Sequence, residues 1–286
     1  MAAAAPAILV RDLRKSYGTF AAVRGIDFEV APGEVFGLLG PNGAGKTSTV
    51  EILEGYRRRD GGIVSVLGHD PERRPRDLRR RIGIVLQSTG MYRHVTVREA
   101  LEHWGHLYPS PRDVDEVIDV AGLRKSEDVR TRRLSGGQLR RLDLALALVG
   151  DPELIFLDEP TTGFDPAARR AAWDTVRSLK GLGKTVLLTT HYLEEAQALA
   201  DRVAIIKDGR ILAEGAPGEL GAGDSSRYRV AWRNGRGLIE QRETDDPTTL
   251  LHELTEAALA RGERLRDLSV TRPSLEDIYL ELTEDG

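Results

Sequence analysis

The stretch Val35-Phe-Gly-Leu-Leu-Gly40-Pro-Asn-Gly-Ala-Gly-Lys46-Thr47 decides the fold of this 286-residue chain. Residues 35–39 form the continuous apolar run that is typical of a strand buried on both faces. The residues that follow match the pattern G-x-x-x-x-G-K-[ST], and residues 46–53 then continue at a helical period. Because a strand, a glycine-rich loop and a helix occur in this order, the sequence predicts a phosphate-binding loop at Gly40–Thr47.

The residue types of this loop suit a nucleoside triphosphate. Glycines let the backbone N–H groups approach phosphate oxygens and allow a positive φ. The helix that follows adds the positive end of its dipole. Lys46 supplies a charge to the same oxygens, and the Thr47 hydroxyl is a ligand for Mg²⁺. We therefore expect ATP to bind at Gly40, Pro41, Asn42, Gly43, Ala44, Gly45, Lys46, Thr47 and Ser48.

Two acidic residues follow a second apolar run, Leu154–Leu157. In phosphate-loop ATPases an aspartate that ends such a strand holds Mg²⁺, which is the predicted role of Asp158. The adjacent Glu159 can polarise the attacking water as a general base. An isolated Asp-Glu pair could also be an exposed strand end, but the phosphate loop upstream favours the catalytic interpretation.

A second glycine-rich segment, Leu134-Ser-Gly-Gly-Gln138, precedes a helical pattern over residues 138–149. One interpretation is structural, because Ser135 is a good N-cap and needs no ligand. The other is functional, because free N–H groups, small residues and a helix N-terminus also make an anion cradle. Local physical chemistry alone leaves both interpretations open.

The motifs, in this order, resemble those of the ATP-binding-cassette (ABC) ATPases, and the resemblance covers about residues 8–219. It implies an α/β fold: a P-loop NTPase core of the ABC type with an antiparallel β subdomain and a helical subdomain at about residues 88–137. It also implies a head-to-tail dimer. In that dimer Ser135, Gly136, Gly137 and Gln138 bind the ATP that the phosphate loop of the other chain holds.

Four further residues match family positions. The resemblance implies that Tyr17 stacks on the adenine ring and that Gln87 reaches Mg²⁺ and the attacking water. It implies that Asp165 links the two ATP sites, and that His191 contacts the γ-phosphate and orients the catalytic glutamate. The predicted catalytic residues are thus Glu159, His191 and Gln87, and the predicted Mg²⁺ ligands are Thr47, Gln87 and Asp158.

Three features refine this resemblance. The stretch His191–Ala196 and the ending Arg272–Thr283 are similar to those of the drug- and polyketide-exporter subgroup, which is daunorubicin-resistance-like. The family usually has leucine where this chain has Phe164. Because the exchange is apolar for apolar, we expect altered packing at the dimer contact and no loss of function.

Composition limits the possible partners. Charged residues make up 30% of the chain and the net charge is −4, which gives no reason to expect nucleic acid. The absence of cysteine excludes disulfides and thiolate metal sites. No stretch approaches the roughly 18 apolar residues of a membrane span, and Met1–Ala7 lacks the features of a signal peptide. The resemblance therefore implies that membrane-spanning permease subunits lie on separate chains.

The C-terminal part of the sequence predicts a small α+β domain at residues 220–286, after a linker at Gly215–Ser226. The strands that we expect there are Tyr228–Trp232, Leu238–Gln241 and Leu265–Val270, and the helices are Thr248–Ala260 and Ser274–Leu282.

Three functions are compatible with these motifs. The first is an ATPase, expected as a homodimer at the cytoplasmic face of the cell membrane, that powers export through separate permease subunits. The second is a non-transport ABC ATPase with soluble partners, in assembly or on the ribosome; the chain lacks the long coiled coil and the tandem cassette usual in such relatives. The third is a switch that binds ATP without turnover, against which the presence of both Glu159 and His191 argues.

Overall fold

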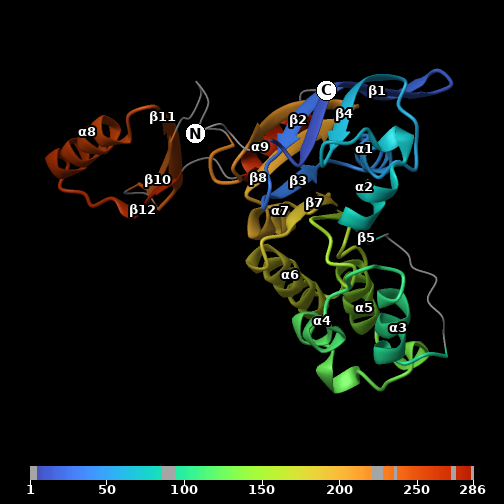
Figure 1. The fold of residues 1–286 in the computed structure, drawn as a ribbon. Helices are drawn as coiled ribbons and strands as arrows, with labels where there is room; N and C mark the ends of the chain where they lie inside the picture. Colours follow the sequence, from blue (N-terminus) through green and yellow to red (C-terminus); the bar gives the residue numbers. More distant parts are fainter. Residues whose placement is uncertain (1–4, 86–93, 221–227, 235–236, 272–274, 285–286) are drawn as a thin grey trace. The chain divides into compact units, whose positions relative to one another are not determined.

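The computed structural model describes residues 5–85, 94–220, 228–234, 237–271 and 275–284. Gln87, Ser274 at the start of the last predicted helix, and residues 221–226 of the predicted linker lie outside these residues. The chain divides into two compact units, Met1–Ala216 and Pro217–Gly286, which we describe separately (Figure 1). No helix in the described ranges is both long enough and apolar enough to cross a membrane.

A six-stranded sheet forms the centre of the first unit, in the order β5-β6-β7-β3-β8-β9. The first five strands of this order are parallel, and β9 pairs antiparallel with β8 through a turn at Asp208 and Gly209, both with positive φ. The Asp-Gly pair between the apolar runs Val203–Ile206 and Ile211–Ala213 predicts such a hairpin, and the structure confirms it. The strands are β3 (Val35–Leu39), β5 (Ile82–Val85), β6 (Leu154–Asp158), β7 (Thr185–Thr190), β8 (Arg202–Lys207) and β9 (Arg210–Gly215).

The central sheet is buried on both faces, as the apolar runs predict. Leu154 and Phe156 of β6 join one apolar cluster, whereas Ile155 and Leu157 join the other, because successive side chains of a strand point to opposite faces. The first cluster contains α1 (Lys46–Leu53) and an antiparallel sheet of order β2-β1-β4. The strands of this second sheet are β1 (Ile8–Tyr17), β2 (Phe20–Val30) and β4 (Gly61–Val66).

Two strands of the antiparallel sheet are longer than the sequence predicts. Apolar and polar residues alternate over residues 8–13 and 26–30, which predicts two strands that end there. In the structure β1 and β2 continue to pair through three register shifts, because the bulged residues are accommodated within the ladder. Pairing between distant strands therefore outweighs the local pattern.

Helices cover the other face of the central sheet and extend from it as a helical subdomain (Figure 1). The helix α5 begins after Ser135, which caps it as predicted. The arginine-rich stretch 73–81 is interrupted at Arg74, whose φ is positive, and then forms an exposed helix in which only Leu78 is buried. The elements are η1 (Pro71–Arg73), α2 (Arg76–Arg81), α3 (Val97–Gly105), α4 (Val114–Val120), η2 (Arg124–Ser126), η3 (Thr131–Arg133), α5 (Gly136–Leu148), α6 (Pro166–Gly181) and α7 (Leu193–Leu199).

The second unit contains a three-stranded antiparallel sheet of order β11-β10-β12. Val230 and Trp232 of the central strand are buried against Leu250 of α8, which forms the small core of this unit. The predicted α+β character is confirmed. The elements are β10 (Tyr228–Arg233), β11 (Ile239–Thr244), α8 (Pro247–Ala260), β12 (Arg266–Thr271) and α9 (Leu275–Glu284).

Candidate functional site

The predicted phosphate-binding loop connects β3 to α1, and its glycines are required by their surroundings. A Cβ at Gly40 would lie 2.1 Å from the backbone oxygen of Ile206. Gly45 has a φ of +107°, and its Cβ would lie 2.5 Å from the backbone oxygen of Ala22. At Gly43, in contrast, no described atom lies within 4 Å of the added Cβ, so this part of the loop faces open space. The loop is therefore packed closely against the backbone at Gly40 and Gly45 and is open at Gly43.

Lys46 lies folded over the loop and is only 4% exposed. Its Nζ donates hydrogen bonds to the carbonyl oxygens of Gly40 (2.8 Å) and Pro41 (3.1 Å) and lies 3.4 Å from Oε1 of Glu159. Burial lowers the pKa of Lys46, and the carboxylate of Glu159 opposes that shift. The ammonium group is thus held beside the loop by two carbonyl oxygens and one carboxylate.

Glu159 receives contacts from three sides. Its Oε1 lies 3.4 Å from Nδ1 of His191, and its Oε2 accepts a hydrogen bond from the Thr162 hydroxyl (3.1 Å). Burial raises the pKa of Glu159, but Lys46, Thr162 and His191 together lower it below its usual range. The carboxylate is therefore ionised near neutral pH and able to accept a proton. Its backbone φ of +44° is in the left-handed region, which residues other than glycine rarely adopt.

Thr189 is a residue of this site that sequence reasoning missed. Its hydroxyl donates to Oδ1 of Asp158 (2.5 Å) and accepts the backbone N–H of Glu159 (3.0 Å). Burial raises the pKa of Asp158, and the hydrogen bond from Thr189 opposes this shift. No local sequence pattern indicates this role of Thr189. It follows from the strand register, in which Asp158 of β6 pairs with Thr189 of β7. Thr189 thus holds both acidic residues in place.

A hollow of about 180 Å³, the P-loop hollow, brings several predicted residues together. Tyr17 lies beside the loop with its hydroxyl 3.0 Å from the Ser48 hydroxyl, and the guanidinium of Arg57 lies 5.2 Å from the centre of its ring. Phe20, which the sequence did not single out, also lines the hollow and is 57% exposed. The lining residues are Tyr17, Phe20, Ala22, Asn42, Gly43, Gly45, Lys46, Thr47, Ser48 and Glu159.

A second hollow, the Ser135 hollow of about 500 Å³, is lined by the other glycine-rich segment. Ser135 and Gln138 form a capping box, and the Gln138 amide also donates to the Ser126 hydroxyl (2.9 Å). The N–H groups of Gly136 and Gly137 lie in the first helical turn, where helix geometry leaves N–H groups without partners. Among the described residues, the P-loop hollow and the Ser135 hollow have no lining residue in common.

Asp165 and Phe164 line the Ser135 hollow. The carboxylate of Asp165 caps α6 by accepting the N–H groups of Ala167 (2.9 Å) and Ala168 (2.8 Å). The structure therefore gives Asp165 a local role in starting the helix. Its predicted role in linking two ATP sites concerns a second chain and stays a prediction.

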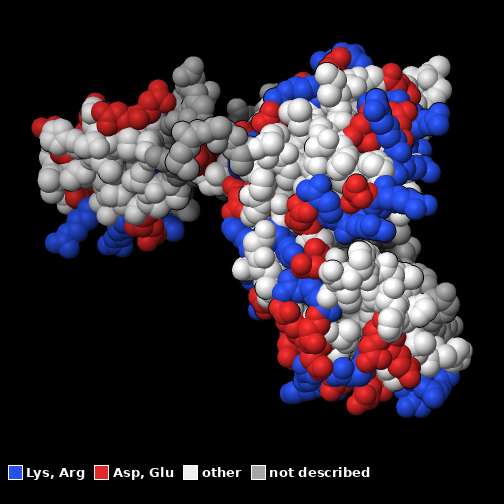
Figure 2. Space-filling model, viewed as in Figure 1, with Lys and Arg blue, Asp and Glu red and all other residues white. Residues whose placement is uncertain are grey.

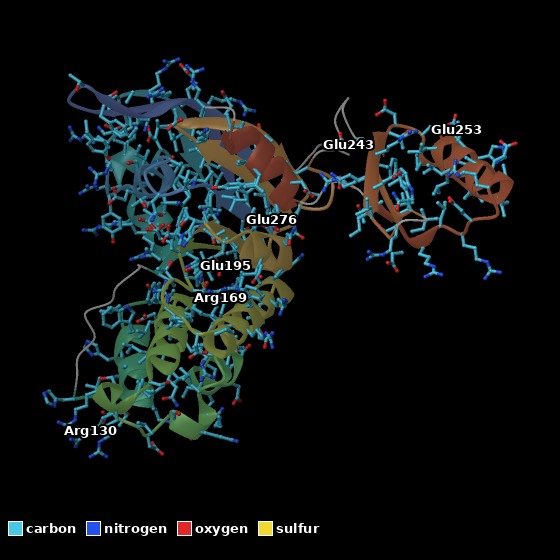
Figure 3. All side chains as sticks on the ribbon, turned by 180° about the vertical axis from the view of Figure 1, so that it is seen from behind. Arg130, Arg169, Glu195, Glu243, Glu253 and Glu276 are labelled. Atoms are coloured by element: carbon cyan, nitrogen blue, oxygen red, sulfur yellow. The ribbon has the colours of Figure 1, made fainter. Side chains whose placement is uncertain are left out.

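A buried acidic residue, Glu195, connects the loop after Glu159 to two helices. It is 1% exposed, and its Oε1 accepts hydrogen bonds from the Thr161 hydroxyl (2.8 Å) and the Trp173 indole (3.1 Å). In Figure 3, Glu195 lies on α7, near Arg169 of α6. In the sequence it is one of two adjacent glutamates on a short helix, so its burial could not be read from the local pattern.

A third hollow, of about 420 Å³, lies between α2, β5 and the helical subdomain; we call it the Glu54 hollow. Its walls include Leu78, Ile84, Trp104 and Tyr108. Figure 2 shows lysine and arginine side chains gathered over α2, next to an uncharged surface over α3. The remaining lining residues are Glu54, Gly55, Tyr56, Pro71, Arg74, Arg79, Ile82, Gly83, Val85, Asp143, Leu146 and Ala147.

Known proteins are similar in sequence to this chain over nearly its whole length. The sequence pattern of the family described as ABC transporter matches residues 23–162. Nod factor export ATP-binding protein I of Paraburkholderia xenovorans (strain LB400) is 41% identical, over 95% of this chain and 95% of its own length. The daunorubicin/doxorubicin resistance ATP-binding protein DrrA of Streptomyces peucetius is 40% identical, over 97% and 92%.

Solved structures share the fold. The cbiO1 protein of Clostridium perfringens, described as part of the ABC transporter complex cbiONQ, has a TM-score of 0.69 and 28% identity, with 77% of this chain and 92% of that protein covered. A structure described as the ATP binding subunit of an ABC transporter has a TM-score of 0.68 over 96% of this chain. Because its identity is 23%, this second likeness concerns the fold alone.

Proposed function

We infer that this chain, which belongs to the ABC transporter family and has that family's ATPase activity, powers export through membrane-spanning subunits on separate chains. The observation that carries the proposal is the convergence of Lys46, Glu159 and His191 at the open side of the phosphate loop, with both distances to the carboxylate at 3.4 Å. Glu159 and His191 directly follow β6 and β7, and Lys46 begins α1 after the loop that leaves β3; these three strands are neighbours in the sheet.

The loop fits a nucleoside triphosphate. Gly43 leaves room in front of the loop, and Lys46 is held with its charge beside that room. Tyr17, which is 40% exposed at the edge of the P-loop hollow, has the π surface for stacking on an adenine ring. When bound, Mg²⁺ would neutralise phosphate charge. The hydroxyl of Thr47 and the carboxylate of Asp158 are the oxygen donors that would hold it, together with the phosphates.

Hydrolysis then requires a base, and Glu159 is the residue that we assign to it. A water oxygen attacks the γ-phosphorus, the bond from that phosphorus to the bridging oxygen breaks, and the proton of the water passes to the Glu159 carboxylate. His191 and Thr162 each face one oxygen of this carboxylate and so fix its direction. Lys46 balances negative charge on the phosphate oxygens.

The separation of the P-loop hollow from the Ser135 hollow supports a head-to-tail dimer. An anion cradle at a helix N-terminus is present in each hollow, yet the described linings share no residue. We propose that the Ser135 hollow of one chain completes the ATP site of another. Since every predicted site residue is present once per chain, two identical chains would form two equivalent sites.

The proposal that the chain works in export rests on its relatives, which are named for Nod factor export and for daunorubicin/doxorubicin resistance. We propose that the Glu54 hollow, where apolar walls from Trp104 and Tyr108 lie open, is where a membrane-spanning subunit docks. The protein would then work at the cytoplasmic face of the membrane.

Co-purification tests this proposal. The Glu159→Gln variant, held in ATP, is extracted from native membranes in detergent, and the proteins that accompany it are identified by mass spectrometry. We expect a polytopic membrane protein. Recovery of soluble or ribosomal partners alone would contradict export and favour a non-transport ATPase. A matched Lys46→Ala variant, which we expect to lose ATP turnover, serves as the control. Proteins that accompany Glu159→Gln but not Lys46→Ala depend on ATP, and proteins that accompany both do not.

A further inference from the structure

We infer that Glu54 recognises the membrane-spanning partner by forming an ion pair with a lysine or arginine side chain of that partner, inside the Glu54 hollow. This inference rests on the proposed function, because it specifies the chemistry of the partner that docks there. Glu54 is not among the residues that line the P-loop hollow, and it lies at the opposite end of α1 from Lys46.

The first argument is the state of the carboxylate. Glu54 is 9% exposed, so nine-tenths of it is buried, and it lines the hollow. Among the described residues, none donates a hydrogen bond to its side chain or lies within ion-pair distance of it. Buried glutamates are rare in proteins unless they are paired. A partner that enters the hollow would supply the missing counterpart.

The second argument is the sign of the local field. Glu54 is the C-cap of α1, the negative end of the helix dipole, and the last turn of this fully described helix contains no basic residue. Burial, Asp158 and Glu51 together raise the pKa of Glu54 to about 8. The negative charges of Asp158 and Glu51 favour a positively charged partner next to the Glu54 carboxylate. An anionic ligand is therefore disfavoured there.

The third argument is that three of the nearby arginines have other partners. Arg74 donates to the carbonyl oxygens of Gly55 (2.8 Å) and Tyr56 (3.3 Å). Arg57 binds Glu51 (2.5 Å). Arg140, which lies 3.8 Å from Asp143 in the same hollow, donates to Pro160. Arg79 also lines the hollow, and no described arginine, Arg79 included, lies within ion-pair distance of Glu54. We therefore assign the cation that pairs with Glu54 to the membrane-spanning partner.

The shape of the hollow indicates how that cation arrives. Leu78, Ile84, Trp104 and Leu146 make its walls largely apolar. A lysine or arginine buries its aliphatic stem against such walls while its charged end reaches a carboxylate. The occupant that fits is an apolar segment bearing one basic side chain, as on a helix at the end of a membrane span.

The position of Glu54 also connects the partner to ATP. The helix α1 begins at Lys46 and Glu54 follows its last residue, so the two ends are about 12 Å apart at 1.5 Å per residue. A partner that pulls on Glu54 acts on the same rigid helix that carries the phosphate-binding lysine. Docking and nucleotide binding would thus be coupled through one element.

Site-specific photocross-linking tests the inference on the full chain in native membranes. The photoreactive residue p-benzoylphenylalanine replaces Tyr108, a wall of the hollow, and the cross-linked peptide is identified by mass spectrometry. We expect a segment of a polytopic membrane protein that contains lysine or arginine. Glu54→Lys should then lower co-purification of that protein about tenfold or more, whereas Glu102→Lys, at an exposed site on α3, should not.

Charge reversal completes the test. Replacing the basic residue of the cross-linked segment by glutamate should abolish co-purification with the wild-type chain and restore it with Glu54→Lys. A cross-linked membrane segment without a basic residue, or full binding by Glu54→Lys, would overturn the role of Glu54 and leave export standing. Cross-links to soluble proteins alone, or to none, would overturn both.

Discussion

Replacing Glu54 by glutamine should stabilise the isolated protein, and more so at high pH. The folded chain holds this carboxyl in a place where its pKa is raised from 4.5 to about 8. Between these two values the folded state binds a proton that the unfolded state releases. The free energy of unfolding therefore falls as the pH rises through that window. Glutamine fills nearly the same volume and has no such proton to lose.

The magnitude follows from the pKa shift. A rise from 4.5 to about 8 is roughly 3.5 units, and each unit corresponds to about 1.36 kcal/mol, which gives a ceiling of about 5 kcal/mol above pH 8. Because water can enter an open hollow, we expect about 2–4 kcal/mol. For a unit of this size, each kcal/mol changes Tm by about 2–4 °C. The Tm of Glu54→Gln should therefore be roughly 5–15 °C above that of the wild type at about pH 8.5. At about pH 5 the two Tm values should be nearly equal.

The assay is unfolding by heat and by urea, followed by circular dichroism at both pH values for the wild type, Glu54→Gln and the control Glu102→Gln. The control removes an exposed carboxylate of α3 and should match the wild type at each pH. The reasoning is refuted if Glu54→Gln shows the same pH dependence as the wild type. Loss of stability in the variant at high pH would show that the carboxylate already has a cationic partner in the free protein.

Three other predictions concern the ATP site. Glu159→Gln should bind ATP as the wild type does and lower turnover at least about a hundredfold, because the amide cannot accept the proton; a turnover assay with a nucleotide-binding control decides. Gly45→Ala should lower the free energy of unfolding by about 1–3 kcal/mol, because the residue has a φ of +107° and the new Cβ would lie 2.5 Å from the backbone oxygen of Ala22. Gly43→Ala has no such contact and should cost less. Equal losses of stability in urea would contradict this prediction. Glu195→Ala should lower the free energy of unfolding by about 2–4 kcal/mol, since Thr161 and Trp173 lose their hydrogen-bond acceptor. Glu195→Gln keeps an acceptor oxygen and should recover most of this loss. Equal losses in the two variants would exclude the role of Glu195 as that acceptor.

The sequence alone predicted the parts of the site that are contiguous. The strand, loop and helix over residues 35–53 could be derived because phosphate recognition requires glycines, a lysine and a helix N-terminus within one short segment. The cap at Ser135 was predicted for the same reason, since capping is local. The family resemblance added Tyr17 and His191, which have no local pattern of their own.

Tertiary structure decided which distant residues meet. Glu159 and His191 lie 3.4 Å apart because β6 and β7 are neighbours, and Thr189 reaches Asp158 through the register of those strands. A local sequence pattern predicts neither the order nor the register of the strands, because both depend on how the apolar faces of the whole sheet are covered.

Glu54 shows the same limit most clearly. In the sequence it stands in Glu51-Ile-Leu-Glu-Gly-Tyr-Arg57, between an acidic and a basic residue, and resembles an exposed helix end. It is buried by the packing of α1 against β4, β6 and η1 and by the distant residues that line the Glu54 hollow with it. The amino-acid sequence by itself thus determined the ATP-binding chemistry, because that chemistry is local. The burial of one carboxylate in an apolar hollow was decided by the tertiary structure, because solvent is excluded by residues far away in the chain.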